Sequence, residues 1–217
     1  MPSIHFQDGS ARAVANIFCI GRNYAAHAAE LGNQVEPEPV VFLKPTSALL
    51  EEGQPLRLPA FSQDVHHEAE LVVLIGQGGK HIAPEAALQH VAGYALGLDL
   101  TARDLQTVAK QKGLPWTLAK GFDGSACVSR FVPAAALPAP GEATFSLDVN
   151  GQRRQSGDCR MMIYDLPFLI AYLSDRFTLQ AGDLIYTGTP AGVAALQAGD
   201  QLALSLPGLI DARFEVA

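Results

Sequence analysis

The stretch from residue 65 to residue 75 constrains the fold more than any other, and it reads Val65-His-His-Glu-Ala-Glu-Leu-Val-Val-Leu-Ile75. Its second half is an apolar run rich in β-branched residues, which predicts a buried β-strand. Side chains two residues apart in a strand point to the same face, so Glu68 and Glu70 should lie side by side. We therefore expect a sheet in which a buried strand begins with two neighbouring carboxylates.

Two adjacent carboxylates repel each other, and burying both as anions is unfavourable unless a cation lies between them. Asp99 ends another strand-like run, so three carboxylates converge if the two strands are neighbours. Such oxygen ligands suit Mg²⁺ or Mn²⁺, which retain waters that substrate oxygens can displace. The alternative is that Glu68 and Glu70 lie on the solvated face of an edge strand, while Asp99 caps a helix that starts near Thr101.

Two histidines before the glutamates leave a second metal chemistry open, because imidazole favours Zn²⁺ or Fe²⁺. In an extended chain His66 shares the face of Glu68, whereas His67 points to the opposite face. A site made of His66, Glu68 and Glu70 is therefore also consistent with the spacing.

His27 and Glu30 are three residues apart on an expected helix, so they lie on one face and can touch. A carboxylate beside an imidazole fixes its tautomer and raises its basicity, as a general base near neutral pH requires. An ordinary polar helix face is the alternative. Lys120 could point into a pocket and stabilise an enolate or bind a carboxylate, or it could be a surface lysine at a strand end. Residues 187–190 could present donors to an anion, or form a plain tight turn.

Strand-like segments outnumber helical ones, and Gly, Pro or Asp lies near most of their ends. The expected strands are 16–20, 40–43, 71–75, 94–99, 145–150, 184–187 and 201–206. The expected helices are 23–31, 84–91, 101–112 and 164–176. Pro84 suits a first helical turn, Thr101 and Asp104 resemble a capping pair, and Asn150-Gly151 predicts a type I′ hairpin. Residues 1–217 are thus expected to form one β-rich α+β domain.

Composition excludes several classes of function. The net charge is −7 with no basic stripe, which argues against a nucleic-acid partner. No apolar run reaches the roughly 18 residues that span a bilayer, and the N-terminus lacks a signal-peptide pattern, so no membrane association is expected. Three widely spaced cysteines without a CxxC pair indicate a reducing compartment, so we expect a cytoplasmic protein. The charged fraction of 17% is low and indicates a surface covered by a partner subunit.

Taken in chain order, these segments resemble the fumarylacetoacetate hydrolase family, specifically its short bacterial and mitochondrial acylpyruvase-like branch. The resemblance runs from about Ile17 to the C-terminus. It is carried by Gly21-Arg-Asn-Tyr-(x2)-His-(x2)-Glu30, Phe42-Leu-Lys-Pro45, His66-His-Glu-Ala-Glu-Leu71, Gly93-Tyr-(x4)-Asp99, Thr101-(x)-Arg-Asp-(x)-Gln106, Gly113-(x)-Pro-Trp-(x3)-Lys120 and Thr187-Gly-Thr-Pro-(x)-Gly192.

The resemblance implies a mixed β-sandwich or roll with a short N-terminal lid helix, usually assembled as a homodimer. It implies that Mg²⁺, or alternatively Mn²⁺, is bound by Glu68, Glu70 and Asp99, which displaces the His66 alternative. The catalytic residues implied are His27, Glu30 and Lys120. The substrate-binding residues implied are Arg22, Asn23, Lys44, Gln106 and Thr189. The less polar stretch 157–162 is expected to border the substrate tail.

The activity implied is hydrolysis of a carbon–carbon bond in acylpyruvates, the 2,4-dioxo acids such as fumarylpyruvate or acetylpyruvate. His27, oriented by Glu30, would activate water, and the departing pyruvate enolate would be stabilised by the metal and Lys120. The same site suits oxaloacetate decarboxylation or tautomerisation, or isomerisation of 2-hydroxyhepta-2,4-diene-1,7-dioate, because each passes through an enolate. A non-catalytic protein that binds 2-oxo acids is the remaining alternative.

Overall fold

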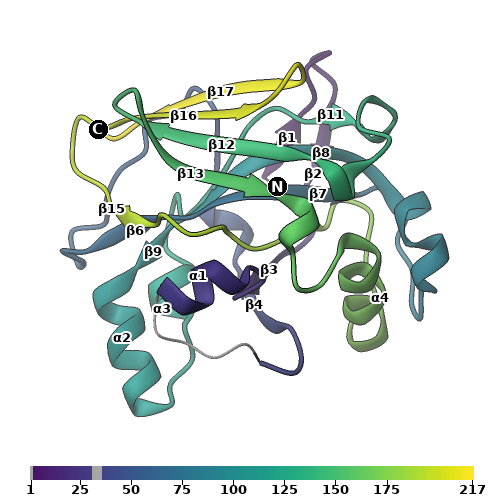
Figure 1. Ribbon diagram of the computed structural model, residues 1–217, viewed down its shortest axis with the longest axis horizontal. Helices are drawn as coiled ribbons and strands as arrows, with labels where there is room; N and C mark the ends of the chain where they lie inside the picture. The colour runs from purple at the N-terminus through teal and green to yellow at the C-terminus, as the bar shows by residue number, and fades with distance from the viewer. Residues whose placement is uncertain (1, 31–35) are drawn as a thin grey trace.

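Two β-sheets packed face to face form the body of the structure, a computed structural model that describes residues 2–30 and 36–217 (Figure 1). Within these residues the larger sheet has eight strands and mixes parallel with antiparallel pairs. Its strands follow the order β4 (Val40–Lys44), β3 (Ile17–Gly21), β14 (Leu184–Tyr186), β7 (Ala69–Ile75), β8 (Val91–Asp99), β10 (Ala126–Val128) and β5 (Leu49–Glu51), with β11 (Val132–Pro133) beside β8.

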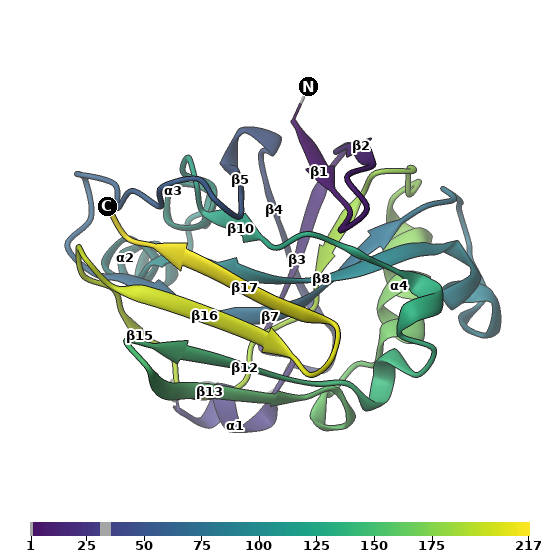
Figure 2. The same cartoon turned by 90° about the horizontal axis from the view of Figure 1, so that it is seen from above.

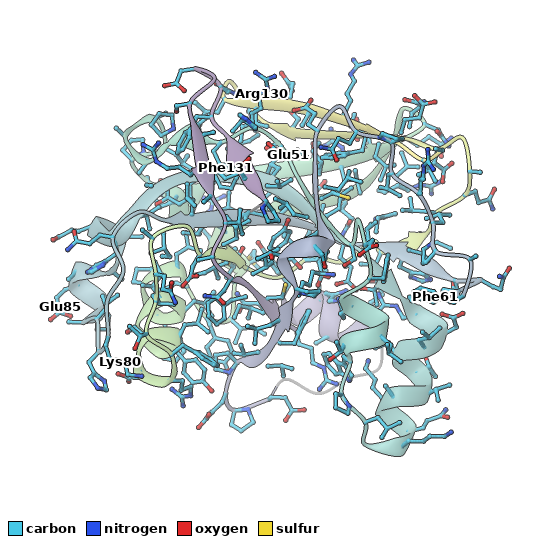
Figure 3. The ribbon with its side chains drawn as sticks, turned by 180° about the vertical axis from the view of Figure 1, so that it is seen from behind. Glu51, Phe61, Lys80, Glu85, Arg130 and Phe131 are labelled. Carbon is cyan, nitrogen blue, oxygen red and sulfur yellow. The ribbon has the colours of Figure 1, made fainter. Side chains whose placement is uncertain are left out.

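The smaller sheet is antiparallel and crosses the larger one, as the view from above shows (Figure 2). Its order is β13 (Gln152–Asp158), β12 (Thr144–Val149), β16 (Gln201–Leu206) and β17 (Ile210–Glu215). Two minor sheets join β1 (Ser3–His5) with β2 (Ala11–Ala13), and β15 (Ala194–Ala195) with β6 (Val65–His67) and β9 (Thr101–Ala102). The β1–β2 hairpin is tied down by the Phe131 N–H, which donates to the His5 carbonyl at 2.9 Å, and Figure 3 shows Phe131 beside it.

The α-helices lie outside the two large sheets. They are α1 (Ala25–Glu30), α2 (Arg103–Lys112), α3 (Thr117–Lys120) and α4 (Leu166–Arg176). Both views place α2 and α3 at one end of the molecule and α4 at the other (Figures 1 and 2). The end that carries α2 and α3 also holds the carboxylates that the sequence singles out.

Strand β7 is fully buried and separates two apolar clusters. Alternate residues of β7 pack against the four-stranded sheet, in a cluster that includes Leu71, Val73, Ile75, Leu147 and Leu204. The residues between them belong to a second cluster on the other face, with Val72, Leu74 and Tyr186. Glu70 has the parity of Val72, so it points away from the four-stranded sheet.

The prediction of a strand-rich α+β fold with a mixed sheet is confirmed. The predicted Asn150-Gly151 turn is present too, since both residues have positive φ, 53° and 75°. That residues 1–217 form one domain stays a prediction, and the predicted helix end at Leu31 lies outside the described residues. In the part of the chain that the structure describes, no helix is both long and apolar enough to span a bilayer.

Two predicted helices differ from the structure. Residues 84–90 form a 3₁₀ helix, in which Pro84 does occupy the first turn. The predicted helix 101–112 begins later, because Thr101 belongs to β9 and its hydroxyl donates to the Asp99 carbonyl at 3.3 Å. The predicted capping pair is wrong, since the Asp104 carboxylate accepts from the Ser62 hydroxyl at 2.7 Å instead.

Gly97, in the middle of β8, gives a direct test of this packing. A Cβ atom there would lie 2.7 Å from the Cys127 carbonyl and 2.7 Å from the Tyr186 ring. Gly97→Ala should therefore lower the free energy of unfolding by about 1–3 kcal/mol, as overpacked cores do, measured by denaturant unfolding. Gly141→Ala is the matched control, because a Cβ there meets nothing within 4 Å. Equal stability of the two variants would contradict the described packing of β8.

Candidate active site

Three buried carboxylates meet where β7 and β8 pair. Ala69 lies opposite Leu98 and Glu70 opposite Gly97, and the Asp99 N–H donates to the Glu68 carbonyl at 2.8 Å. This register places Asp99 across from Glu68, with Glu70 two residues along on the same face. One oxygen from each of the three side chains lies within 4.8 Å of the others. Glu68 itself interrupts the strand, between β6 of one sheet and β7 of another.

Two buried lysines and one partly buried arginine contact these carboxylates. The Lys120 ammonium donates to Glu68 Oε2 at 2.8 Å and to Asp99 Oδ2 at 2.6 Å. Lys44 Nζ lies 2.8 Å from Asp99 Oδ1 and donates to the main-chain carbonyls of Leu100 and Lys120. The Arg103 guanidinium donates to Glu68 Oε1 at 2.5 Å. Lys120 is thus a buried group at the end of α3, which excludes the alternative of a surface lysine at a strand end.

The local charges set the protonation of the cluster. Burial raises the pKa of Glu68, but the charges of Lys120 and Arg103 outweigh it and hold that pKa well below its ordinary value. Burial and the negative charges of Asp99 and Glu68 raise the pKa of Glu70 well above its ordinary value. For Lys120 burial lowers the pKa, and the two carboxylates more than reverse this, so the ammonium stays charged. Glu70 is therefore the group whose charge the protein compensates least.

These residues fit a divalent cation. Asp99 Oδ1 is buried and has no hydrogen-bond partner among the described residues, because Lys44 approaches it outside hydrogen-bonding geometry. Glu70 accepts one main-chain hydrogen bond, from Gly188 at 2.7 Å. Carboxylate oxygens of this kind are the ligands that Mg²⁺ and Mn²⁺ prefer. The alternative site with His66 is not formed, since His66 Nε2 faces Asp64 Oδ1 at 2.9 Å.

The loop 187–192 connects the carboxylates to α1. Besides the Gly188 bond to Glu70, the Gly192 N–H donates to both Glu30 oxygens, at 3.0 and 3.1 Å. Gly188 has φ of +103°, and a Cβ there would lie 2.6 Å from the Asn23 Cβ, so only glycine fits. The Thr189 hydroxyl donates to the Ala69 carbonyl at 2.8 Å. The loop is therefore more than a plain tight turn, because it fixes groups at both sides of the cluster.

His27 is buried, and its Nδ1 lies 3.4 Å from Glu30 Oε2. Burial lowers the pKa of His27, while the charge of Glu68 and the hydrogen bond with Glu30 oppose that shift. The imidazole is therefore neutral at pH 7, and with Nδ1 turned to Glu30 the other ring nitrogen can exchange a proton. That α1 acts as a lid stays a prediction.

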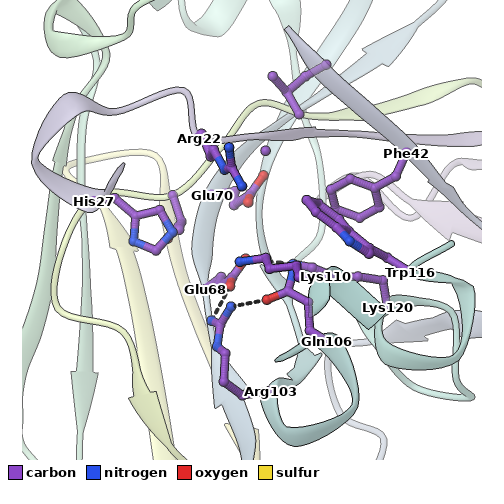
Figure 4. Close-up of a pocket in the computed structure, with 13 residues that line it drawn as sticks. Arg22, His27, Phe42, Glu68, Glu70, Arg103, Gln106, Lys110, Trp116 and Lys120 are labelled. Carbon is purple, nitrogen blue, oxygen red and sulfur yellow. Dashed lines mark hydrogen bonds and ion pairs between the residues drawn. The ribbon is translucent and has the colours of Figure 1, made fainter. Parts of the chain in front are cut away.

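A single pocket brings most of the predicted site residues together (Figure 4). Including its open mouth, it holds about 380 Å³. Its lining contains residues that were predicted to be catalytic, substrate-binding or metal-binding: Arg22, His27, Glu68, Glu70, Gln106, Lys120 and Thr189. Figure 4 shows His27 and Lys120 on opposite sides of Glu68 and Glu70.

The structure does not bring every predicted residue into the pocket. Asn23 is fully buried, and its side-chain amide bonds the main chain of Tyr164 and Thr187 instead. Lys44 lies behind Asp99 rather than in the lining. None of the stretch 157–162 lines this pocket, and Cys159, Arg160 and Met162 line a different surface groove. Asn23 fixes the start of the loop 187–192 and Lys44 contacts Asp99 and the Lys120 carbonyl. A substrate contact for either stays a prediction.

Six pocket residues received no role from the sequence: Ile20, Gly21, Phe42, Arg103, Lys110 and Trp116. A signal for two of them exists, because Arg103, Gln106 and Lys110 are spaced i, i+3 and i+7 on the expected helix and so share one face. Gln155 was also missed. It lies on β13, far along the chain, and its buried amide bonds Thr189 Oγ1 at 2.8 Å and His67 Nδ1 at 2.9 Å.

The fold and this charged pocket define a known class of protein. The sequence model of the fumarylacetoacetate (FAA) hydrolase C-terminal family matches residues 16–217, and the chain belongs to this family. The confirmed family resemblance covers nearly the whole chain.

Particular relatives are similar over almost their full lengths. The chain is 49% identical over 201 residues to oxaloacetate tautomerase FAHD1, mitochondrial, of Rattus norvegicus, covering 93% of this chain and 91% of the relative. It is 47% identical over 196 residues to oxaloacetate tautomerase YcgM of Escherichia coli (strain K12), covering 90% of each. The crystal structure of fumarylpyruvate hydrolase from Pseudomonas aeruginosa in complex with Mn²⁺ and pyruvate superimposes with a TM-score of 0.95 at 39% identity, covering 100% of this chain and 95% of that one.

Metal binding should reverse the effect of a Glu70→Gln substitution on the stability of the protein. With a chelator present, Glu70→Gln should leave the protein as stable as the parent or more stable near pH 7, because a buried carboxylate with a raised pKa opposes folding once it ionises. With Mg²⁺ or Mn²⁺ at about 100 times its Kd, the parent should gain about 2.7 kcal/mol. For a protein of this length, that gain corresponds to a rise of roughly 5–10 °C in melting temperature. The Glu70→Gln variant should lose most of this metal-induced rise.

Thermal unfolding with and without metal measures both effects. Glu85→Gln, outside the acidic cluster on the 3₁₀ helix 84–90, is the matched control and should respond like the parent. A Glu70→Gln protein that keeps the full metal-induced shift would remove Glu70 from the metal site.

Proposed function

We propose that this protein is a divalent-metal-dependent oxaloacetate tautomerase that interconverts the enol and keto forms of a 2-oxo acid. The observation that carries the proposal is the placement of a neutral, buried His27 and a charged, buried Lys120 on opposite sides of the same carboxylate cluster. The names of the relatives from rat and Escherichia coli support oxaloacetate as the substrate. They favour this alternative over acylpyruvate hydrolysis, which the sequence placed first.

The reaction moves one proton, from the enol oxygen to the neighbouring carbon or back. Glu68, Glu70 and Asp99 would hold the cation, which when bound supplies a Lewis acid for the carboxylate and the 2-oxygen of the substrate. His27 is the group that can take up or release the proton, because its neutral ring has one nitrogen free of Glu30. Lys120 keeps its proton and so stabilises negative charge near the 2-oxygen.

Glu30 would act by orienting His27, because its carboxylate is itself held by the Gly192 N–H. Arg103 and Gln106 are bonded to each other at 2.7 Å and line the same wall. They would limit the movement of a bound 2-oxo acid, together with the main chain around Thr189. Decarboxylation of oxaloacetate releases CO₂ and leaves the enolate of pyruvate, whose negative charge Lys120 would stabilise in the same way, so it is expected as a side activity.

Hydrolysis of acylpyruvates is the second candidate, and the His27–Glu30 pair favours it, because water activation needs such a base. The fumarylpyruvate hydrolase of Pseudomonas aeruginosa supports it as well. Isomerisation of 2-hydroxyhepta-2,4-diene-1,7-dioate would also use an enolate and a proton transfer by His27. A non-catalytic binding protein would have no use for the His27–Glu30 pair. Homodimer formation, a cytoplasmic location and the choice between Mg²⁺ and Mn²⁺ stay predictions.

His27→Asn should lower the rate of oxaloacetate tautomerisation about 10²–10⁴-fold, the usual contribution of a general acid–base group. The rate is measured by adding the metal-loaded protein to the enol form of oxaloacetate and following the loss of the ultraviolet absorbance of the enol. His81→Asn, which removes an exposed histidine outside the pocket, should behave like the parent. A parental rate for His27→Asn would contradict the proposal. Faster cleavage of acetylpyruvate than tautomerisation by the parent would make hydrolysis the main activity.

The pH dependence should report His27. Because its neutral form accepts the proton, kcat/KM should fall as the pH drops through its pKa, which burial holds below the ordinary value of histidine. A bound cation would push in the same direction. Glu30→Gln removes an interaction that raises this pKa, so the acid limb should move to still lower pH in a pH–rate profile. An acid limb that stays in place or moves upward would show that His27 is not the titrating base.

A further inference from the structure

Lys110 differs from the other cations of the pocket in its partners. Arg103 is paired with Glu68, Lys120 with Glu68 and Asp99, and Arg22 with Glu36 at 2.7 Å. Among the described residues, no carboxylate lies within 4.0 Å of the Lys110 ammonium, although its side chain contributes to the pocket lining. Lys110 therefore carries positive charge into the pocket mouth that the protein itself does not neutralise.

Its position follows from the helix that bears it. Lys110 is seven residues after Arg103 on α2, and Gln106 lies between them on the same face. One helix face thus carries Arg103, which bonds Glu68, and Gln106 and Lys110, all of which line the pocket (Figure 4). A ligand whose one end lies at the cluster would extend its other end along this face.

An aromatic wall holds the ammonium without neutralising it. Lys110 Nζ lies 5.6 Å from the centre of the Trp116 ring, and that ring packs edge-on against Phe42 at 5.8 Å. A cation over a ring is attracted but keeps its full charge. Burial and the nearby charges of Arg22 and Arg103 lower the pKa of Lys110, which is the sign of a positive local potential. An anion placed beside Lys110 would be stabilised by its charge.

We propose that Lys110 forms a subsite for the carboxylate remote from the 2-oxo acid end of the substrate, so that the pocket selects dicarboxylates over 2-oxo acids with one carboxylate. This inference rests on the proposed function only for the end of the ligand that faces Glu68, Glu70 and Asp99. It assigns to Lys110 a role in specificity, and it assigns the aromatic wall of Phe42 and Trp116 to the carbon chain between the two ends.

A matched pair of ligands tests the subsite by binding alone. Difluorination at carbon 3 gives 3,3-difluoro-oxaloacetate, which cannot enolise, and 2-oxobutanoate has the same four carbons with a methyl group in place of the remote carboxylate. Their dissociation constants are measured by titration calorimetry on the Mn²⁺-loaded protein. Lys110→Ala should weaken the dicarboxylate roughly tenfold, a charged hydrogen bond discounted for its exposed position. The constant for 2-oxobutanoate should change less than twofold.

Lys112→Ala is the control, because it removes the same charge from the same helix outside the pocket lining. It should change neither constant more than twofold, and Lys110→Arg should retain the preference for the dicarboxylate. Equal weakening of both ligands by Lys110→Ala, or equal effects of Lys110→Ala and Lys112→Ala on the dicarboxylate, would overturn the subsite.

The proposed function can fail separately. If the parent binds 3,3-difluoro-oxaloacetate in a Lys110-dependent manner but does not tautomerise oxaloacetate, the subsite stands and the proposed reaction falls. If the parent tautomerises oxaloacetate but Lys110→Ala binds both ligands like the parent, the reaction stands and the subsite falls.

Discussion

The need to balance three buried carboxylates governs this protein. Glu68, Glu70 and Asp99 are each at most 5% exposed, and an isolated ionised carboxylate in such surroundings is strongly unfavourable. Lys44, Lys120 and Arg103 supply the compensating charge from three different elements, β4, α3 and α2. The cluster therefore links α2, α3 and the edge strand β4 to the centre of the large sheet. It leaves Glu70, with its raised pKa, as the position where a further cation is most stabilising.

The fold turns this constraint into a reactive surface. The four-stranded sheet covers one face of β7 and β8, and the opposite face carries a second apolar cluster and, at the end where Glu70 and Asp99 lie, the carboxylates. The loop 187–192 then ties that face to α1, bonding Glu70 through Gly188 and Glu30 through Gly192. His27 is consequently held near the cluster through Glu30, which accepts hydrogen bonds from this loop. Rigid positioning of this kind is what proton transfer at a fixed carbon requires.

The sequence predicted the parts of the site that depend on local periodicity. The two-residue spacing of Glu68 and Glu70 and the three-residue spacing of His27 and Glu30 led to contacts that the structure shows, and the assignment of roles to these residues stays a prediction. Pairings between distant elements could not be read in this way. The neighbouring sequence does not indicate that Thr101 belongs to a strand. It also does not indicate that the Asn23 amide bonds the main chain of Tyr164 and Thr187, or that the Gln155 amide bonds Thr189 from a different sheet. The sequence assigned no role to Lys110, because a lysine on a polar helix face is ordinarily solvated.

The central claim is that Glu68, Glu70 and Asp99 together bind one divalent cation opposite His27. Anomalous diffraction from a crystal of the protein soaked in Mn²⁺ tests it most directly. The account predicts one strong anomalous peak at about 2 Å from an oxygen of each of the three carboxylates. A peak that lies elsewhere, or one that contacts His66 instead of Glu70, would contradict it.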